Sequence, residues 1–248
     1  MKTLTALRSA LFFAWFVSVS VVLHILALPT LLMPACAIQA TARLWARALL
    51  FGLKIFAGLG YEVRGPIPRN GAFVASKHMS MWDTLALYVL LDKPTAVLKR
   101  ELLSIPFYGW YLKKAGVIAI DRAGRASAMR KMVADARAMA AAGRAILIFP
   151  EGTRKKPGAA PDYKPGVAGL YSQLGLACHP VALNSGLYWT GPGGFLKKPG
   201  TVVVEFLPPI PPGLKRAEFM TALESGIENA TARLVVEGRA NLTALGLT

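Results

Sequence analysis

The amino-acid sequence predicts an α/β fold with a mixed, largely parallel sheet flanked by helices, preceded by an N-terminal two-helix membrane-attachment segment. A long stretch without charged side chains lies between Arg8 and Arg43. Beyond Gly60, short aliphatic runs alternate with segments of helical length, which is typical of α/β layer folds. The total of 248 residues suits one such domain plus the attachment segment. We therefore expect residues 1–59 to form the attachment segment and residues 60–248 to form a single α/β domain.

The first apolar run covers residues 10–28. It is long enough to cross or enter a bilayer whose hydrocarbon core is about 30 Å thick. Pro29 and Pro34 follow the run and end the helix, because proline removes a backbone donor and clashes with the preceding turn. The prolines therefore separate this helix from a second one.

The second helix, expected over residues 38–59, carries three basic residues on an otherwise apolar surface. At about 100° per residue, Arg43, Arg47 and Lys54 fall within roughly 40° of one another. Such a basic stripe is typical of a helix that lies in the membrane interface.

The α/β region is divided into elements by hydrophobic periodicity and by turn residues. Strands are expected over residues 61–64, 71–76, 95–99, 117–120, 145–149, 179–183 and 201–206. Helices are expected over residues 81–91, 102–114, 125–142, 165–174 and 216–237. Reactive or basic side chains follow four of the strands, and ligands collect at such loops in α/β sheets. One site is therefore expected to gather Lys77-His78, Lys99, Asp121-Arg122 and residues 151–154.

The formal charge of +16 predicts a surface that attracts phosphates, anionic lipids or nucleic acid. No basic segment is interleaved with aromatic residues, and no zinc-finger or helix-turn-helix spacing occurs, so we expect no nucleic-acid partner. Cys36 and Cys178 are the only cysteines, too few for a disulfide framework or a cysteine metal cluster. We expect no bound metal, and we expect Cys178 to be a buried core residue.

His78 and Asp83 are the first candidate catalytic residues. On one continuous helix they would lie about 140° apart and could not touch. A productive pair therefore needs His78 in a loop and Asp83 in the first turn of the next helix, with Ser80 as the N-cap. Asp83 would then hold one ring nitrogen of His78 and leave the other free as a base. The alternative is a capping box in which His78 is an ordinary loop residue. We expect neither side chain to support the core.

A second group of candidates lies in the loop that follows the strand at residues 145–149. Gly152 lets backbone N–H groups approach an anion, and Arg154 supplies a planar charged fork for phosphate oxygens. Glu151 accepts a hydrogen bond from a substrate hydroxyl or orients Arg154, and Thr153 lies between them. The alternative is a β-turn with a solvated charge pair.

Arg122 follows another buried strand and is the second candidate for binding phosphate. Together with Arg154 it would clamp a phosphomonoester, whereas the alternative is a surface pair with Asp121. The sequence contains no Gly-x-Ser-x-Gly elbow, Walker loop, dinucleotide fingerprint or HExxH motif. Serine-hydrolase, NTPase, dehydrogenase and zinc-protease interpretations therefore lack their usual residues.

Taken together, residues 74–183 resemble the glycerophospholipid acyltransferase family. Four blocks stand in the family's order: His78-x4-Asp83, residues 118–122, residues 149–154 and residues 178–182, with residues 99–102 and 105–109 resembling the family's linker. Two positions depart from the family pattern. Lys77 stands where asparagine is commoner, and His179 replaces an aliphatic residue before Pro180.

The resemblance implies transfer of a fatty acyl group to the sn-2 hydroxyl of lysophosphatidic acid, which gives phosphatidic acid without a covalent acyl-enzyme. His78, oriented by Asp83, would deprotonate the hydroxyl, and Lys99 or nearby backbone N–H groups would stabilise the oxyanion. The co-substrate would be acyl-CoA or acyl-acyl carrier protein, with no cofactor. Another lysolipid acceptor, such as lyso-ornithine lipid, is the alternative within the family. A non-catalytic basic membrane-binding protein is the alternative outside it.

Both flanks of the apolar segment are basic, so the cytosolic bias of lysine and arginine gives neither end a reason to cross. We therefore expect a re-entrant hairpin in the bacterial inner membrane, with the α/β domain on the cytoplasmic face and in contact with membrane lipids. A single membrane span is the second interpretation. A cleaved secretory signal with small residues at 35–37 is the third, and it conflicts with the use of a cytosolic thioester.

Overall fold

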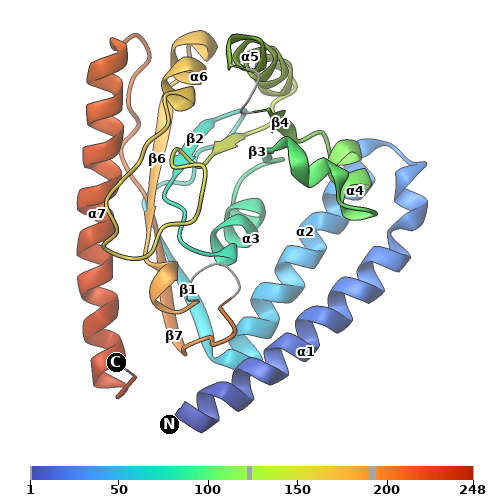
Figure 1. Ribbon diagram of the computed structural model, residues 1–248, viewed down its shortest axis with the longest axis vertical. Coiled ribbons are helices and arrows are strands. Elements are labelled where there is room, and N and C mark those ends of the chain that lie inside the picture. Colours follow the sequence, from blue (N-terminus) through green and yellow to red (C-terminus); the bar gives the residue numbers. More distant parts are fainter. Residues whose placement is uncertain (1, 122–124, 190–193, 248) are drawn as a thin grey trace.

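Figure 1 shows the computed structural model, which describes residues 2–121, 125–189 and 194–247. Its centre is a seven-stranded sheet in the order β1-β7-β6-β2-β5-β3-β4. The strands are β1 (Leu59–Arg64), β2 (Phe73–Ser76), β3 (Thr95–Lys99), β4 (Ile118–Ile120), β5 (Ile146–Ile148), β6 (Cys178–Leu183) and β7 (Gly200–Phe206). The β6–β7 pair is antiparallel and every other neighbouring pair is parallel. The predicted mixed, largely parallel sheet is confirmed.

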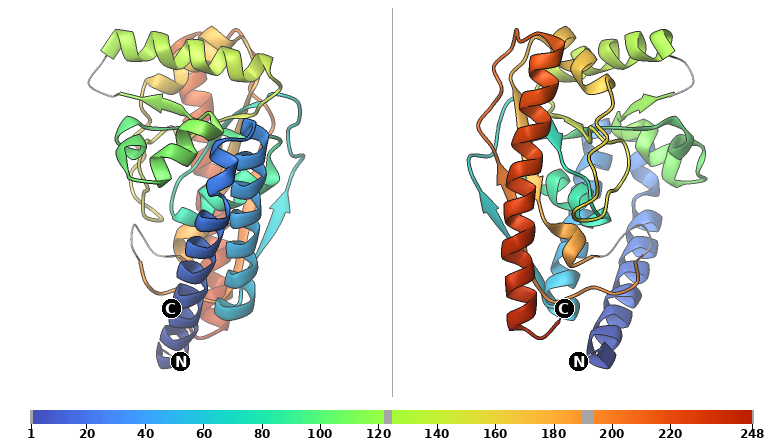
Figure 2. Two further views of the ribbon diagram at one scale, coloured as in Figure 1. Left: turned by 90° about the vertical axis from the view of Figure 1, so that its right-hand side faces the viewer. Right: turned by 60° about the vertical axis from the view of Figure 1, so that its left-hand side comes forward.

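Helices cover both faces of this sheet. They are α1 (Lys2–Leu26), α2 (Ala35–Gly52), α3 (Met81–Leu90), α4 (Tyr108–Ala115), α5 (Arg125–Ala141), α6 (Gly166–Leu174) and α7 (Arg216–Ala244). Short helical turns are η1 (Leu28–Leu31), η2 (Leu53–Ala57), η3 (Arg100–Ser104) and η5 (Ser185–Leu187). In Figures 1 and 2, α7 lies on one side of the sheet and the α1–α2 pair on the other, and the two chain ends lie at the same end of the molecule.

Successive side chains of the central strands feed two separate core clusters, as the alternation of a β-strand requires. On β2, Val74 packs into the cluster shared with α1, α2 and α3. Its neighbours Phe73 and Ala75 pack into the cluster shared with α5, α6 and α7. Because both faces are covered, β2 is buried throughout, which explains its continuous apolar sequence.

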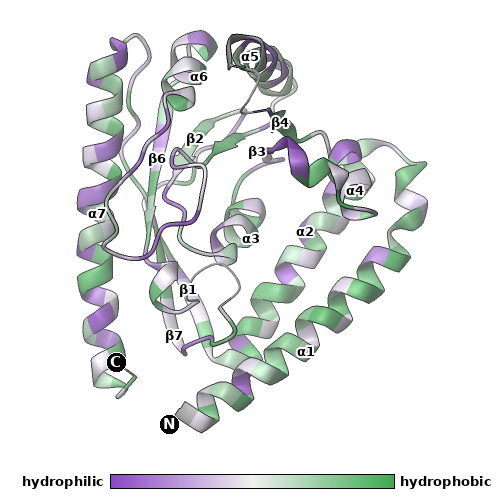
Figure 3. Ribbon diagram, viewed as in Figure 1, coloured by the Kyte–Doolittle hydropathy of each residue, from purple (hydrophilic) through white to green (hydrophobic). Residues whose placement is uncertain are grey.

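The N-terminal helices form a hairpin through η1, with Pro29 and Pro34 in the connection. Within the described residues, one helix is long and apolar enough to cross a membrane, at Thr3–Leu26, and few of its residues are buried. Figure 3 shows this helix as hydrophobic along most of its length. The hairpin also packs on the α/β part, because Phe12 and Leu49 belong to the main core cluster.

The predicted basic stripe on the second helix is wrong for Arg43. Its guanidinium donates hydrogen bonds to the backbone oxygens of Val89 at 3.0 Å and Leu91 at 2.8 Å. These carbonyls lie at the C-terminal end of α3, where cations are stabilised by the unpaired backbone acceptors. Arg47 and Lys54 remain exposed.

The helix expected over residues 102–114 is interrupted. Pro106 follows η3, and Phe107 has a positive φ of 61°, so α4 starts only at Tyr108. The interruption follows from the lost N–H of proline and its clash with the preceding residue. It leaves an exposed aromatic segment, here called the aromatic loop (residues 104–110), which runs from the end of η3 into the first turn of α4. In it the rings of Phe107 and Trp110 meet edge to face at 5.0 Å.

Candidate active site

Parallel strands bring their carboxyl ends to one edge of the sheet, and the expected site residues meet there. A cavity of about 680 Å³ opens at this edge, between the ends of β2, β3 and β5 and the first turn of α6. The expected residues on its wall are His78, Lys99, Gly152, Thr153 and Arg154. The strand order therefore unites candidates that the chain separates by up to seventy-six residues.

His78 and Asp83 form the expected pair. His78 lies in the loop after β2, and its Nδ1 lies 3.0 Å from Asp83 Oδ2. Ser80 is the N-cap of α3 and Asp83 its N3 residue, with both bonds of the capping box present. The same carboxylate therefore pairs with His78 and caps α3, so both interpretations of the sequence apply to Asp83.

The hydrogen bonds to Asp83 determine which ring nitrogen of His78 carries the proton. Oδ2 also accepts from the backbone N–H of Met79 at 2.6 Å and of Ser80 at 2.8 Å. An oxygen surrounded by donors receives the Nδ1 proton as well, so the neutral imidazole has an unprotonated Nε2. Within the described residues Nε2 has no hydrogen-bond partner, which leaves it available as a base.

The other oxygen of Asp83 is held by two serine hydroxyls. Ser185, in η5 after β6, donates to Oδ1, and the hydroxyl of Ser80 lies 3.3 Å from the same oxygen. Asp83 is fully buried, so these donors replace water around its charge. Contrary to expectation, Asp83 therefore supports the core, because it organises the start of α3. Sequence reasoning missed Ser185, although its place just after a strand end was a usable signal.

The imidazole of His78 is also fixed from its flat side. It stacks on the ring of Phe149, with centroids 3.9 Å apart and planes 19° apart. The backbone oxygen of His78 accepts from the N–H of Lys155 at 2.9 Å. The loop after β5 thus contacts His78 through a ring and through the backbone. The side chain of His78 is only 12% exposed.

The same loop carries the expected anion-binding residues. Gly152 has a φ of 61°, which favours glycine, and its N–H donates to the oxygen of Phe149 at 2.8 Å. Arg154 is half-buried on the cavity wall, and within the described part of the chain its guanidinium has no carboxylate partner. A desolvated, unpaired guanidinium favours an anionic ligand. Thr153 is exposed beside it.

Two further candidates flank the cavity. Lys99 is exposed at the end of β3, on the wall that also includes Asp121. Asp121 accepts a hydrogen bond from Arg100 at 3.1 Å. Arg122 lies outside the described residues, so its expected contribution to a phosphate clamp stays a prediction.

Glu151 lies elsewhere than the sequence indicated. Its side chain is buried behind the loop, away from the cavity wall, and its Oε1 lies 3.0 Å from Lys77 Nζ. Lys77 Nζ also lies 2.7 Å from Glu228 Oε1 on α7. Burial raises the pKa of the Glu151 carboxyl, and Lys77 counteracts part of that rise. Sequence reasoning missed the link to Glu228, for which no local motif exists.

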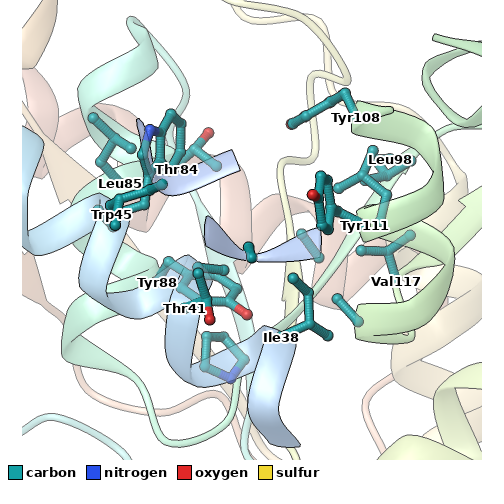
Figure 4. Close-up of a pocket in the computed structure, with 18 of the residues that line it drawn as sticks. Ile38, Thr41, Trp45, Thr84, Leu85, Tyr88, Leu98, Tyr108, Tyr111 and Val117 are labelled. Carbon is teal, nitrogen blue, oxygen red and sulfur yellow. The ribbon is translucent and has the colours of Figure 1, made fainter. Parts of the chain in front are cut away.

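A second, smaller cavity of about 160 Å³ adjoins the first (Figure 4). Both are lined by Trp45, Leu85, Leu98 and Tyr108, so one continues into the other. The labelled residues in Figure 4 come from α2, α3, β3, α4 and the turn before β4, and most of them are aliphatic or aromatic. This arrangement suits an extended hydrocarbon chain.

Two further expectations concern the thiol of Cys178 and a bound metal. Cys178 is fully buried, and burial raises the pKa of its thiol, which disfavours the nucleophilic thiolate. Among the described residues, no group of three or more His, Cys, Asp or Glu side chains could hold a metal ion.

Comparison with known proteins gives three findings. The family model described as "Acyltransferase" matches residues 61–184. The chain is 38% identical over 162 residues to the 1-acyl-sn-glycerol-3-phosphate acyltransferase of Pseudomonas aeruginosa, covering 64% of this chain and 63% of that protein. It is 31% identical over 194 residues to the mouse 1-acyl-sn-glycerol-3-phosphate acyltransferase alpha, covering 75% of this chain and 68% of that protein.

The fold is also similar to a solved structure, the 1-acyl-sn-glycerophosphate acyltransferase of Thermotoga maritima. The TM-score is 0.74, with 93% of this chain and 97% of that chain covered. At 20% sequence identity this likeness concerns the fold.

Proposed function

The chain belongs to the acyltransferase family, and we propose that it transfers a fatty acyl group from a thioester to the sn-2 hydroxyl of lysophosphatidic acid, giving phosphatidic acid. One observation carries this proposal. His78, whose Nδ1 is held by Asp83, and Arg154 line one cavity, and that cavity shares part of its wall with an apolar one. The names of the Pseudomonas and mouse relatives support the same acceptor.

In this reaction His78 Nε2 takes the proton of the sn-2 hydroxyl as its oxygen attacks the thioester carbonyl carbon. The C–O bond forms, and a tetrahedral oxyanion results. Its collapse breaks the C–S bond, and the leaving thiolate takes the proton back from the imidazolium. Asp83 stabilises that imidazolium through Nδ1–H. Lys99, on the cavity wall, or backbone N–H groups in the loop after β5 would stabilise the oxyanion.

The phosphomonoester of the acceptor would bind Arg154, with Thr153 and backbone N–H groups near Gly152 as further donors. Arg122 completes the clamp in this proposal. The strongly positive chain, at +16, favours this anionic acceptor and also a donor carried on CoA or on acyl carrier protein.

The acyl chain would extend from the thioester into the smaller cavity. Its walls come partly from the N-terminal hairpin, through Leu23 on α1 and Ile38 on α2, and partly from α4 through Tyr111. An apolar wall gives a hydrocarbon chain a site without unpaired polar groups.

We further infer that the hairpin attaches the enzyme to the cytoplasmic face of the bacterial inner membrane. The exposed apolar side of α1 supports membrane contact. The aromatic loop, residues 104–110, runs from the end of η3 into the first turn of α4, and α4 packs against the hairpin. Trp110 and Phe107 are exposed there, as is typical of membrane-interface residues. Removal of the hairpin is a poor test of attachment, because Phe12 belongs to the main core.

The test is an assay of the purified full chain in vesicles with lysophosphatidic acid or lyso-ornithine lipid, each with acyl-CoA or an acyl carrier protein thioester. We expect phosphatidic acid from the first acceptor, and no product from the His78→Ala control. Acylation of lyso-ornithine lipid alone would contradict the proposed acceptor. Equal turnover by the His78→Ala protein would contradict the proposed base.

A further inference from the structure

We propose that Lys77, Glu151 and Glu228 form a positioning network that ties α7 to the two catalytic loops. The network would hold the loop bearing Arg154 in register with the base His78. Its kinetic consequence rests on the proposed function, whereas its effect on loop mobility does not.

The network joins three separate parts of the chain. Lys77 directly follows β2, Glu151 lies in the loop after β5, and Glu228 lies in the middle of α7. Lys77 Nζ donates to Glu151 Oε1 at 3.0 Å and to Glu228 Oε1 at 2.7 Å. Tyr163, in the segment between β5 and α6, donates its hydroxyl to the same Glu228 oxygen at 2.9 Å. One ammonium therefore bridges two carboxylates from different layers.

Burial makes this bridge obligatory rather than incidental. The side chains of Lys77 and Glu151 are 2% and 1% exposed, whereas Glu228 is 24% exposed. A buried ammonium without a carboxylate, or a buried carboxylate without a cation, is strongly disfavoured. Within the described residues the second oxygen of Glu151 has no hydrogen-bond partner. Glu151 therefore depends on Lys77, and Lys77 is held in turn by Glu228.

The network does not touch the cavity where substrates would bind. None of its three acidic or basic side chains lies on the wall that includes His78 and Arg154. Lys77 directly precedes His78, however, and Glu151 stands three residues before Arg154. The backbone bond from Lys155 N–H to His78 oxygen joins the same two loops on the cavity side. The loops are thus linked on both of their sides.

α7 is the helix to which the network attaches. It packs along one face of the sheet, where Phe219, Leu223 and Ile227 enter the core cluster (Figure 2). The hydrophobic effect that drives this packing is non-directional. The bridge from Glu228 to Lys77 is directional and charge-assisted, so it fixes the position of α7 relative to the loops.

The experiment compares Glu228→Ala and Glu228→Gln with the control Glu224→Ala in the full chain. Glu224 lies one helical turn earlier on α7 and has no ion pair with Lys77 in the described structure. The first readout is hydrogen–deuterium exchange of residues 150–156, which include the Gly152 and Lys155 amides bonded to Phe149 and His78. We expect these amides to exchange about tenfold faster in Glu228→Ala, less so in Glu228→Gln, and unchanged in the control.

The second readout is kinetic, well below the unfolding temperature. Glu228→Ala should raise the lysolipid KM by about five- to tenfold and lower kcat, while the KM for the thioester stays within about twofold. A merely structural role would lower the unfolding temperature and leave both KM values and the loop exchange unchanged, and that result would overturn the proposal. Glu228→Gln keeps Lys77 paired with Glu151, so it provides a folded variant if the alanine protein does not fold.

The two proposals can fail separately. If the wild-type chain does not acylate lysophosphatidic acid, the exchange measurement still decides whether the network holds the loop. If the wild-type chain is active and Glu228→Ala matches Glu224→Ala in exchange and in KM, the network is refuted while the activity stands.

Discussion

Two different substitutions of Asp83 should separate its two roles, the capping of α3 and the support of His78. Asp83→Ala removes the acceptor of His78 Nδ1–H and also leaves the buried N–H groups of Met79 and Ser80 without a partner. A lost N-cap interaction costs about 0.5–2 kcal/mol, and each buried unpaired donor about 1–3 kcal/mol. Together these costs give an expected loss of about 2.5–8 kcal/mol. In a protein of this size that corresponds to a fall of roughly 5–32 °C in Tm.

Asp83→Asn should preserve the same geometry without the charge. The amide oxygen can take the place of Oδ2, and the amide hydrogens can donate to the hydroxyls of Ser185 and Ser80, which can accept as well as donate. Folding should therefore change little. The imidazolium of His78 loses a charge-assisted partner, so kcat should fall by about ten- to a hundredfold.

The assay measures Tm by scanning calorimetry in vesicles and kcat under saturating substrates for both variants. Wild-type Tm in Asp83→Ala would refute the view that this carboxylate organises the start of α3. Undiminished kcat in a folded Asp83→Asn protein would show that its charge does not assist the base.

The remaining predictions concern five other side chains. His78→Ala should lower kcat by about 10²- to 10⁴-fold with little change in Tm, measured by the same two methods. Arg154→Ala should lower kcat/KM for lysophosphatidic acid about ten- to a hundredfold. Arg154→Lys should recover only part of that loss, because an ammonium cannot form the bidentate fork. A change in the thioester KM instead would assign Arg154 to the donor. Burial raises the pKa of Glu151 from its ordinary value of 4.5. Stability from a carboxyl with a raised pKa is present while it is protonated and is lost as the pH rises through that pKa, so the Tm of Lys77→Met should climb towards that of wild type as the pH is lowered through the raised pKa of Glu151. Finally, brominated lipids should quench part of the wild-type tryptophan fluorescence. Trp110→Phe should reduce that quenching, with Trp15 on α1 supplying the remainder. Unchanged quenching would place the aromatic loop away from the membrane.

Periodicity and strand-end chemistry predicted most of the fold and the site. The buried run around Val74 and the loop at His78 follow from local sequence, because strands covered on both faces are continuously apolar. The position of Asp83 also follows locally, from the cap at Ser80. The parallel strand order then places Arg154 and His78 on one cavity, and no additional sequence motif is needed to predict this.

Other contacts depend on tertiary structure and leave no local pattern. The burial of Glu151 depends on which way the loop after β5 turns, and its partner Glu228 lies on a helix whose position along the sheet is set by packing. Arg43 was likewise expected in a surface stripe. Its contact with the C-terminal end of α3 depends on how the two helices pack. Long polar side chains adapt to whichever carbonyls or charges the packing brings near.

The N-terminal hairpin supplies part of the wall of the smaller cavity, and this has a consequence for how the protein is made. A ribosome releases α1 and α2 first, whereas β3 and α4, which supply the opposite wall, follow about forty to sixty residues later. Under the proposed membrane attachment, the pocket is therefore completed by segments that are synthesised after the hairpin. Leu23 and Ile38 are part of the pocket as well as of the hairpin, so a change in the hairpin that improves insertion also reshapes the place where the acyl chain would bind. If both proposals hold, selection on membrane insertion and selection on acyl chain length act on the same residues.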